Sequence, residues 1–296
     1  MNFRNIKEAV IKYFFAVIAW ISILILAAII ITLFKEGLPI FKEVSFFDLL
    51  LGTRWYPTGE PAEFGMFPLI FASIVVTLGA IFVCVPLGVG SALFIHEIAT
   101  PKQRAFLKPA IELLAGIPSI IYGFFGMVVV APFIQNLFNI PVGLCGFTAS
   151  LILGVMATPT VCSISEDALS YVPKNLKEGS LALGASRWQT LVNVILPAAG
   201  SGISTAIILG MSRAFGETMV VLMVAGGAAQ IPSSIFDPIR PMTSTIAAEM
   251  GESVVGSMHY HALFGLAMIL FFTTFLFNLV AEFLSRKYRL KLGVGK

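Results

Sequence analysis

Two ionisable residues stand out because they fall inside an apolar stretch of the chain. Arg213 is the only one of nineteen Lys and Arg residues deep within an expected membrane span, and Glu217 follows four residues later on the same face of a helix. An Arg near the centre of a membrane helix costs about 2.5–3.5 kcal/mol on insertion scales, so it normally faces a cavity or a partner. Because a guanidinium can grip a tetrahedral oxyanion with two hydrogen bonds, we predict an anion contact on a translocation path, with Glu217 holding Arg213 in position. A structural ion pair that locks helix packing is the alternative.

A second candidate region is the polar segment from Lys174 to Pro197, the longest polar interruption in the second half of the chain. Its leucines recur at helical spacing. The pattern predicts a short helix that ends near Gly184, a turn, and a second helix from about residue 187 that runs into a membrane span. Small residues next to Glu178 suit a helix that presses into a groove on another protein. A plain cytoplasmic connector is the alternative.

The cysteines and two histidines predict no redox or metal chemistry. Cys84, Cys145 and Cys162 lie in apolar runs without paired spacing, so we expect small buried hydrophobes and no disulfide. His259 and His261 stand two residues apart, which does not place them on one helix face. We therefore expect a neutral interfacial pair and no metal site.

The remaining polar groups offer little chemistry. Glu166 and Asp167, near the inner end of an expected span, read as ordinary caps or solvated charges. Ser119 and Tyr122 follow a Pro at an expected helix start and could donate to an anion, although hydrogen bonds to the backbone are the commoner fate of such groups. The sequence has no phosphate-binding Walker loop, no nucleophilic-serine elbow and no zinc-binding helix, so we predict no catalytic residue, no cofactor and no ATP hydrolysis by the chain itself.

The elements that must position these residues are membrane helices. Of 296 residues, 57% are hydrophobic and only 12% are charged, whereas soluble domains carry about 25% charged residues. Residues 1–13 are polar, and 14–34 form an uncharged run long enough to cross a hydrocarbon core of roughly 30 Å. No cleavage site follows, so we expect this first transmembrane helix to be retained.

Five further spans are predicted within a core of residues 68–284. An external loop, 35–67, precedes the core, and a basic tail, 285–296, follows it. The expected spans are 68–95, 111–134, 144–164, 203–225 and 262–281, with a charged link at 96–110, the polar loop at 165–200 and an external segment at 228–261. The expected fold is therefore all-α: a polytopic membrane protein of six transmembrane helices.

The distribution of Lys and Arg sets the orientation. The N-terminus, the links 96–110 and 165–200 and the tail together hold 14 of the 19 basic residues, and the opposite loops hold four. Basic loops stay in the cytoplasm. We therefore expect both termini and the 174–197 loop to be cytoplasmic.

The cytoplasmic loop carries a family resemblance. Glu178-Gly179-Ser180, then Gly184, then Val194-Ile-Leu-Pro197 resembles the EAA loop of ABC importer permeases, with Gly179 and Ser180 in place of two alanines. The resemblance implies a type I importer-like fold. It also implies that this loop is the coupling helix that docks on the ATPase subunit through Glu178 and Gly184.

A second resemblance concerns the substrate. Residues 212–219, with Arg213-Ala-Phe-Gly-Glu217-Thr, look like the signature of phosphate importer permeases. Residues 116–126 and 242–252 resemble the third-span start and the last external segment of the C-type subunits of those importers, and the likeness runs from about 68 to 284. The resemblance assigns Arg213 and Glu217 to the substrate pathway.

The resemblance also implies a setting. It predicts a multi-pass subunit of the bacterial cytoplasmic membrane that pairs with a second permease subunit, two ATP-binding subunits and an external phosphate-binding protein. The lipid bilayer is its surrounding, and no nucleic acid is expected. Two alternatives stay open: a permease for another oxyanion such as sulfate or molybdate, and an ion-driven anion carrier or channel gated by Arg213 and Glu217.

Overall fold

The computed structural model describes residues 3–291, and within this part six helical segments are long and apolar enough to cross a membrane. They are Val10–Lys42, Phe67–Ile98, Ser119–Phe138, Gly146–Ser170, Arg187–Phe215 and Met258–Val280. The all-α, six-span prediction is confirmed. Of the expected terminal segments, residues 1–2 and 292–296, with Lys296 of the basic tail, lie outside the described residues.

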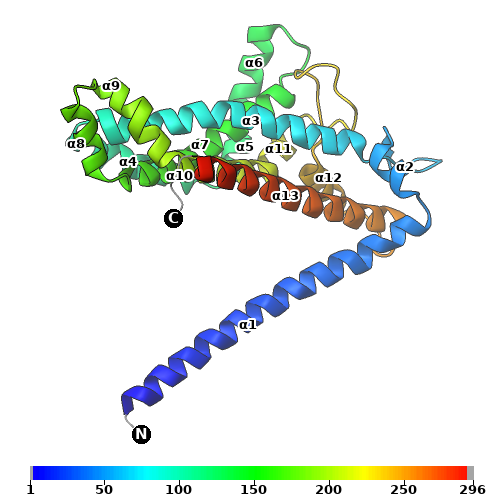
Figure 1. Cartoon of the computed structure of the whole chain (residues 1–296). Coiled ribbons are helices and arrows are strands. Elements are labelled where there is room, and N and C mark those ends of the chain that lie inside the picture. The colour runs from blue at the N-terminus through cyan, green and yellow to red at the C-terminus, as the bar shows by residue number, and fades with distance from the viewer. Residues whose placement is uncertain (1–2, 292–296) are drawn as a thin grey trace.

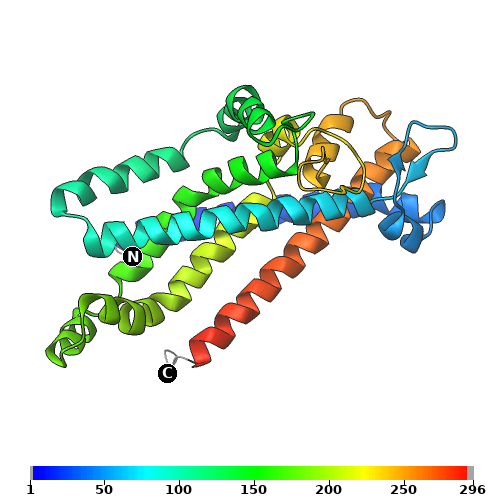
Figure 2. The same ribbon diagram turned by 90° about the horizontal axis from the view of Figure 1, so that it is seen from above.

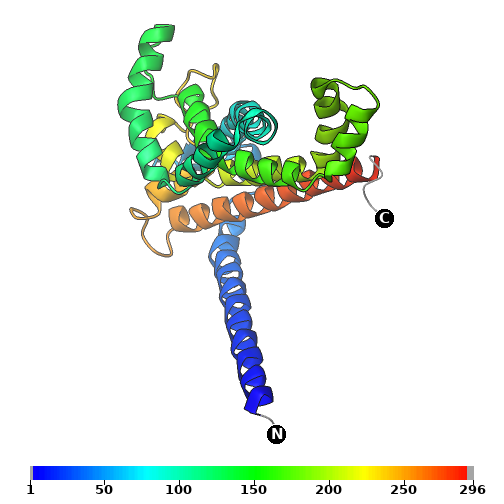
Figure 3. The same cartoon turned by 90° about the vertical axis from the view of Figure 1, so that its left-hand side faces the viewer.

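The first helix stands apart from the bundle. α1 (Phe3–Gly37) touches α13 (Met258–Lys291) only near its C-terminal end, where the rings of Phe34 and Phe272 lie 5.9 Å apart. Towards its N-terminus α1 diverges from the other helices (Figures 1 and 3), and its apolar side chains are exposed. This helix has most of its apolar surface available for lipid or for another subunit.

The segment after α1 forms a folded cap, although the sequence indicated only a polar loop. It contains η1 (Leu38–Lys42), α2 (Phe46–Leu51) and a hairpin in which β1 (Trp55–Tyr56) pairs antiparallel with β2 (Glu63–Phe64). Ile40, Leu49 and Trp55 are buried in one cluster with residues of α13. The cap therefore packs on the end of the bundle.

The centre of the bundle is the pair formed by α3 (Phe67–Leu93) and α7 (Gly146–Ser170), which pack along each other. Small residues allow the close approach: a methyl group on Gly154 would lie 2.9 Å from the carbonyl oxygen of Ala80 and 2.5 Å from Cβ of Val83. The three cysteines are buried, as predicted: Cys84, Cys145 and Cys162.

The third span begins later than predicted. After a π-helical turn, η2 (Phe94–Ile98), the expected link is itself a helix, α4 (Pro101–Ala115), whose first turn is closed by a capping box between Thr100 and Gln103. The span then runs through α5 (Ser119–Phe125), η3 (Gly126–Val130) and α6 (Ala131–Phe138). Pro118 explains the break, because a residue before proline disfavours helical geometry.

The fifth span is also displaced. It runs through α9 (Arg187–Thr190), the π-helical η4 (Leu191–Ile195) and α10 (Leu196–Phe215), and it ends where the sequence had suggested its middle. Two short helices follow, α11 (Met219–Val224) and α12 (Met242–Glu249), before α13. They lie towards the end of the bundle that carries α2, whereas α9 and both described chain ends lie towards the opposite end (Figures 1 and 2).

Candidate functional site

Arg213 lies in the last turn of α10, where the helix stops inside the bundle. α10 ends at Phe215, Gly216 forms the C-cap, and the chain is not helical again until α11. A cation in the last turn is favoured by the helix dipole. Broken helices that line a cavity are a recurrent feature of transport sites, because their ends expose backbone groups and oriented dipoles.

One neighbour holds the guanidinium. Nη1 of Arg213 donates a hydrogen bond of 3.0 Å to Oγ1 of Thr160, near the middle of α7. The Tyr122 hydroxyl of α5 is close enough to interact electrostatically with Arg213. The side chain is half-buried, and its other N–H groups have no acceptor among residues 3–291. Arg213 therefore keeps donors available for an anion.

The structure does not pair Arg213 with Glu217. Oε1 of Glu217 accepts hydrogen bonds from the backbone N–H groups of Met219 at 3.1 Å and Val220 at 3.3 Å, at the start of α11. The backbone oxygen of Glu217 accepts from Oγ1 of Thr243 in α12 at 2.8 Å. The expectation that the two residues share one helix face is wrong, because Gly216 ends α10 between them. The ion-pair alternative is likewise not observed.

The glycines that flank this region differ in function. A methyl group on Gly210 would lie 2.5 Å from Cγ2 of Val161, so this glycine brings α10 close to α7. Gly216 has no such neighbour and instead ends the helix. Thr160, which holds Arg213, escaped the sequence analysis, because one threonine in an apolar helix carries no signal of its own.

The loop from Lys174 to Pro197 has the predicted helix–turn–helix form. α8 (Lys174–Ala182) ends two residues before the positive-φ Gly184 (φ +85°), and α9 begins at Arg187 behind a capping box between Ser186 and Gln189. Glu178 and Gly184 are both exposed. The loop also presents large apolar side chains to solvent, with Leu183 90% and Trp188 70% exposed. This surface has the exposed hydrophobic groups of a docking site.

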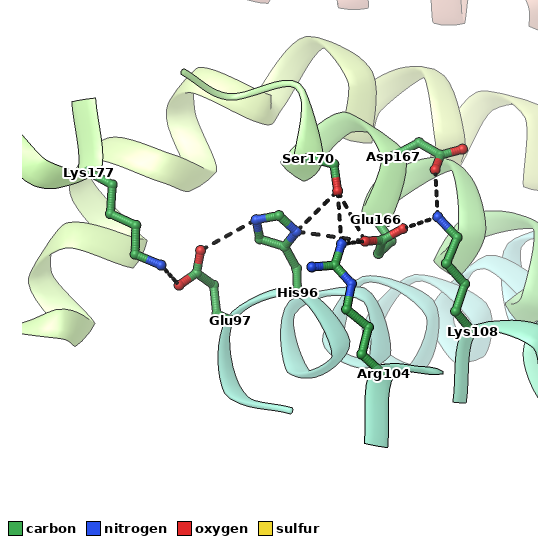
Figure 4. Close-up of polar contacts among 8 residues, drawn as sticks. All are labelled: His96, Glu97, Arg104, Lys108, Glu166, Asp167, Ser170 and Lys177. Atoms are coloured by element: carbon green, nitrogen blue, oxygen red, sulfur yellow. Dashed lines mark hydrogen bonds and ion pairs between the residues drawn. The ribbon is translucent and has the colours of Figure 1, made fainter. Parts of the chain in front are cut away.

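Sequence reasoning missed a charged cluster at the same end of the bundle (Figure 4). The α4–α7 charge cluster comprises His96, Glu97, Arg104, Lys108, Glu166, Asp167, Ser170 and Lys177. At its centre the Glu166 side chain is only 2% exposed, and it accepts hydrogen bonds from Arg104, from Lys108 at 2.5 Å and from Ser170 at 3.1 Å. The prediction of an ordinary cap or solvated charge is wrong for Glu166.

Ion pairs extend the cluster in two directions. On one side Lys108 also reaches Asp167, at 3.0 Å, and its hydrogen bonds to Glu166 and Asp167 raise the pKa of Lys108. On the other side the His96 ring lies between Glu166 and Glu97, at 3.7 and 3.6 Å. These contacts join α4, α7 and η2 into one unit.

His259 and His261 do not form a pair. Nε2 of His259 lies 2.9 Å from Oε2 of Glu249. The Glu249 carboxylate also accepts hydrogen bonds from Trp55 and Arg240. Nδ1 of His261 instead lies 2.7 Å from the backbone oxygen of Glu36. His259 thus connects α13 to α12, and His261 connects α13 to the end of α1.

Comparison with known proteins finds a matching family and similar relatives for this chain. Residues 85–290 match the family model described as binding-protein-dependent transport system inner membrane component. The chain is 40% identical, over 90% of its length and 87% of the relative's, to a probable ABC transporter permease protein, YqgH, of Bacillus subtilis. It is 33% identical, over 93% of its length and 89% of the relative's, to the phosphate transport system permease protein PstC of Mesorhizobium japonicum.

Solved structures show the same fold. A bacterial alginate ABC transporter, crystallised with a periplasmic protein bound to an alginate pentasaccharide, superposes with a TM-score of 0.69 at 15% identity, over 96% of each chain. The methionine transporter MetNI in an inward-facing conformation gives a TM-score of 0.60 at 20% identity, over 78% of this chain and 99% of that one. Helices α3 to α13 thus have the arrangement of an ABC importer permease.

Proposed function

This chain belongs to the family of binding-protein-dependent transport system inner membrane components, and from that premise we propose that it is a transmembrane permease subunit of an ATP-driven importer of inorganic phosphate. Relatives that carry the name of phosphate permeases support the substrate. The observation that carries the proposal is Arg213, which has one side-chain partner and free N–H donors at a break between two helices. A planar guanidinium meets a tetrahedral oxyanion with two parallel hydrogen bonds, and phosphate supplies the required oxygens.

Glu217 has a different task from Arg213 in this pathway. Its carboxylate caps α11, and its backbone oxygen anchors α12. We assign it the task of fixing the helix break, so that the end of α10 stays open beside Arg213. An uncompensated Arg213 attracts phosphate more strongly than one neutralised by a neighbouring carboxylate would.

Docking of the ATPase is assigned to α8, Gly184 and α9. Glu178 offers a carboxylate on the exposed face of α8, and Leu183 and Trp188 offer apolar anchors beside it. Large apolar side chains that become buried in a partner's groove supply most of the binding energy of such contacts. Two ATP-binding subunits would hydrolyse ATP and move these loops, and this chain would contribute no catalytic group.

A second permease subunit would complete the pathway. Arg213 is half-buried in the single chain, and the exposed apolar face of α1 leaves room for another membrane subunit. An external binding protein would deliver phosphate at the end that carries α2 and α12. The opposite end carries α8, α9 and both termini. The distribution of Lys and Arg supports a cytoplasmic location for that end.

Uptake into vesicles tests the proposal. The full complex, with both permeases, the ATPase and the binding protein, is reconstituted with ATP inside or outside, and uptake of labelled phosphate is measured. We expect uptake that requires ATP on the coupling-loop side and that excess sulfate or molybdate does not suppress. Uptake without ATP, driven by an ion gradient, would identify a carrier, and preferential uptake of sulfate or molybdate would identify a different oxyanion importer.

A further inference from the structure

Helix α8 is attached to the bundle by two side-chain hydrogen bonds, which lead in different directions. Oγ of Ser180 lies 3.0 Å from Oγ1 of Thr190 in α9, the first helix of the fifth span. Nζ of Lys177 lies 2.5 Å from Oε2 of Glu97 in η2, which continues α3. Among the described residues α8 makes no other side-chain hydrogen bond. One bond therefore leads to α10 and Arg213, and the other leads to α3.

The second attachment ends in the α4–α7 charge cluster. Glu97 lies beside His96, which lies beside the buried Glu166, and Glu166 binds the two cations of α4 (Figure 4). Three carboxylates and three cations balance: Glu97, Glu166 and Asp167 against Lys177, Arg104 and Lys108. The cluster is thus neutral with a neutral His96. Lys177 is the member that α8 contributes.

A cavity separates α8 from the cluster over much of this contact. It has a volume of about 360 Å³, and its lining includes His96, Glu97, Arg104, Ser170, Lys177 and Leu181. Side chains on opposite sides of such a space have few van der Waals contacts with one another. The Lys177–Glu97 pair bridges the two sides, so a displacement of α8 reaches α3 through this pair more directly than through packing.

We propose that the Lys177–Glu97 ion pair transmits the motion of α8 to the cytoplasmic end of α3, and through His96 and Glu166 to α7 and α4. This inference rests on the proposed function of α8 as the ATPase contact. Lys177 and Glu97 are positioning residues in this scheme, since neither touches the substrate. Ser180–Thr190 gives the parallel route into α10.

The test separates transmission from assembly. Glu97→Gln and Lys177→Gln each remove the charge pair, and the exchange Glu97→Lys with Lys177→Glu restores it in reverse. Lys102→Gln is the matched control, because Lys102 is an exposed lysine of α4, outside the docking segment, and has no side-chain partner among the described residues. For each complex three quantities are measured: recovery of the ATPase subunit, basal ATP hydrolysis, and hydrolysis stimulated by the binding protein with inorganic phosphate.

We expect both single variants to recover the ATPase subunit and to keep basal hydrolysis, while the ratio of stimulated to basal hydrolysis falls about 5-fold or more. The exchange should restore at least half of that ratio, and Lys102→Gln should match the parent protein. An unchanged ratio in the single variants would overturn the proposal. So would loss of the ATPase subunit from those variants, because the pair would then serve assembly, or an exchange variant that assembles but stays uncoupled.

The proposed function fails separately. A parent complex that assembles and hydrolyses ATP, but is stimulated by a different anion, refutes phosphate as the substrate. The same variants then test transmission with that anion.

Discussion

The two cationic centres of this chain have opposite surroundings. Arg213 has one neutral hydrogen-bond partner and unpartnered donors at a helix break, whereas Arg104 and Lys108 converge on a carboxylate that is 2% exposed. A buried carboxylate is tolerated only when it is paired and hydrogen-bonded, so Glu166 and its cations satisfy one another. The comparison shows that the satisfied charges hold helices together, whereas Arg213 keeps the donors that the proposed function assigns to the substrate.

The largest effect is expected at Arg213. Arg213→Gln should abolish phosphate uptake while the complex still assembles, because the Arg213 side chain makes no ion pair within the described part of the chain. Arg213→Lys keeps the charge but loses the two-pronged geometry, and a lost charge-assisted hydrogen bond of about 1.5–3 kcal/mol corresponds to roughly 10- to 100-fold weaker transport. Vesicle uptake at several phosphate concentrations measures both changes.

An exchange variant sharpens this prediction. Arg213→Glu with Glu217→Arg would restore transport if the two residues served as a packing ion pair. Because the structure gives each of them separate partners, we expect no restoration. Recovery of uptake in that exchange would place both residues in packing and would remove the contrast with Glu166.

At Glu166 we expect a loss of stability. Glu166→Gln leaves Arg104 and Lys108 without their shared counter-ion. Breaking a buried pair costs about 3–5 kcal/mol, and we expect roughly 1–3 kcal/mol here, because the cations are 40% and 36% exposed and can reach water. Thermal unfolding of the purified complex measures the change.

Asp167→Asn is the matched control for Glu166→Gln, since Asp167 binds the same lysine but is 55% exposed. It should change stability by no more than about 0.5 kcal/mol. Equal losses in the two variants would mean that burial of Glu166 contributes nothing.

Gly179 offers a test of docking that leaves the chain itself undisturbed. A side chain at Gly179 would meet nothing within 4 Å in this protein, and valine is slightly better than glycine in a helix. If α8 lies in a groove of the ATPase, Gly179→Val should lower recovery of the ATPase subunit several-fold, by a clash with the partner alone. Normal recovery and normal uptake would contradict the docking assignment.

The smallest effect is expected at Thr160. Thr160→Val removes the hydroxyl that holds Arg213 and keeps the shape, whereas Thr160→Ser keeps the hydroxyl. A neutral hydrogen bond contributes about 0.5–1.5 kcal/mol, so uptake at low phosphate should fall roughly 2- to 10-fold in the valine variant and little in the serine variant. Equal uptake in both variants would show that Arg213 needs no positioning.

The sequence predicted best where charge or glycine interrupts an apolar pattern. Six spans and the turn at Gly184 follow from such interruptions. The end of α10 was missed although Gly216 and Glu217 mark it, because the apolar residues of α11 follow so closely that both helices were assigned to one span. For this reason the prediction that Arg213 and Glu217 lie on one helix face is wrong. Glu166 was missed because a carboxylate at the end of a span resembles a solvated one, and its partners are far away in the sequence.

The distance along the chain between Glu166 and its cations has a consequence for biosynthesis. Arg104 and Lys108 precede Glu166 by 62 and 58 residues, so the ribosome makes both cations before it makes the carboxylate. Burying that carboxylate alone would cost several kcal/mol. Because α4 is synthesised first, its two cations are already available when α7 is made. The last turn of α7 can then enter the bundle with its charge neutralised. The cluster thus favours assembly of the helices from the N-terminus towards the C-terminus.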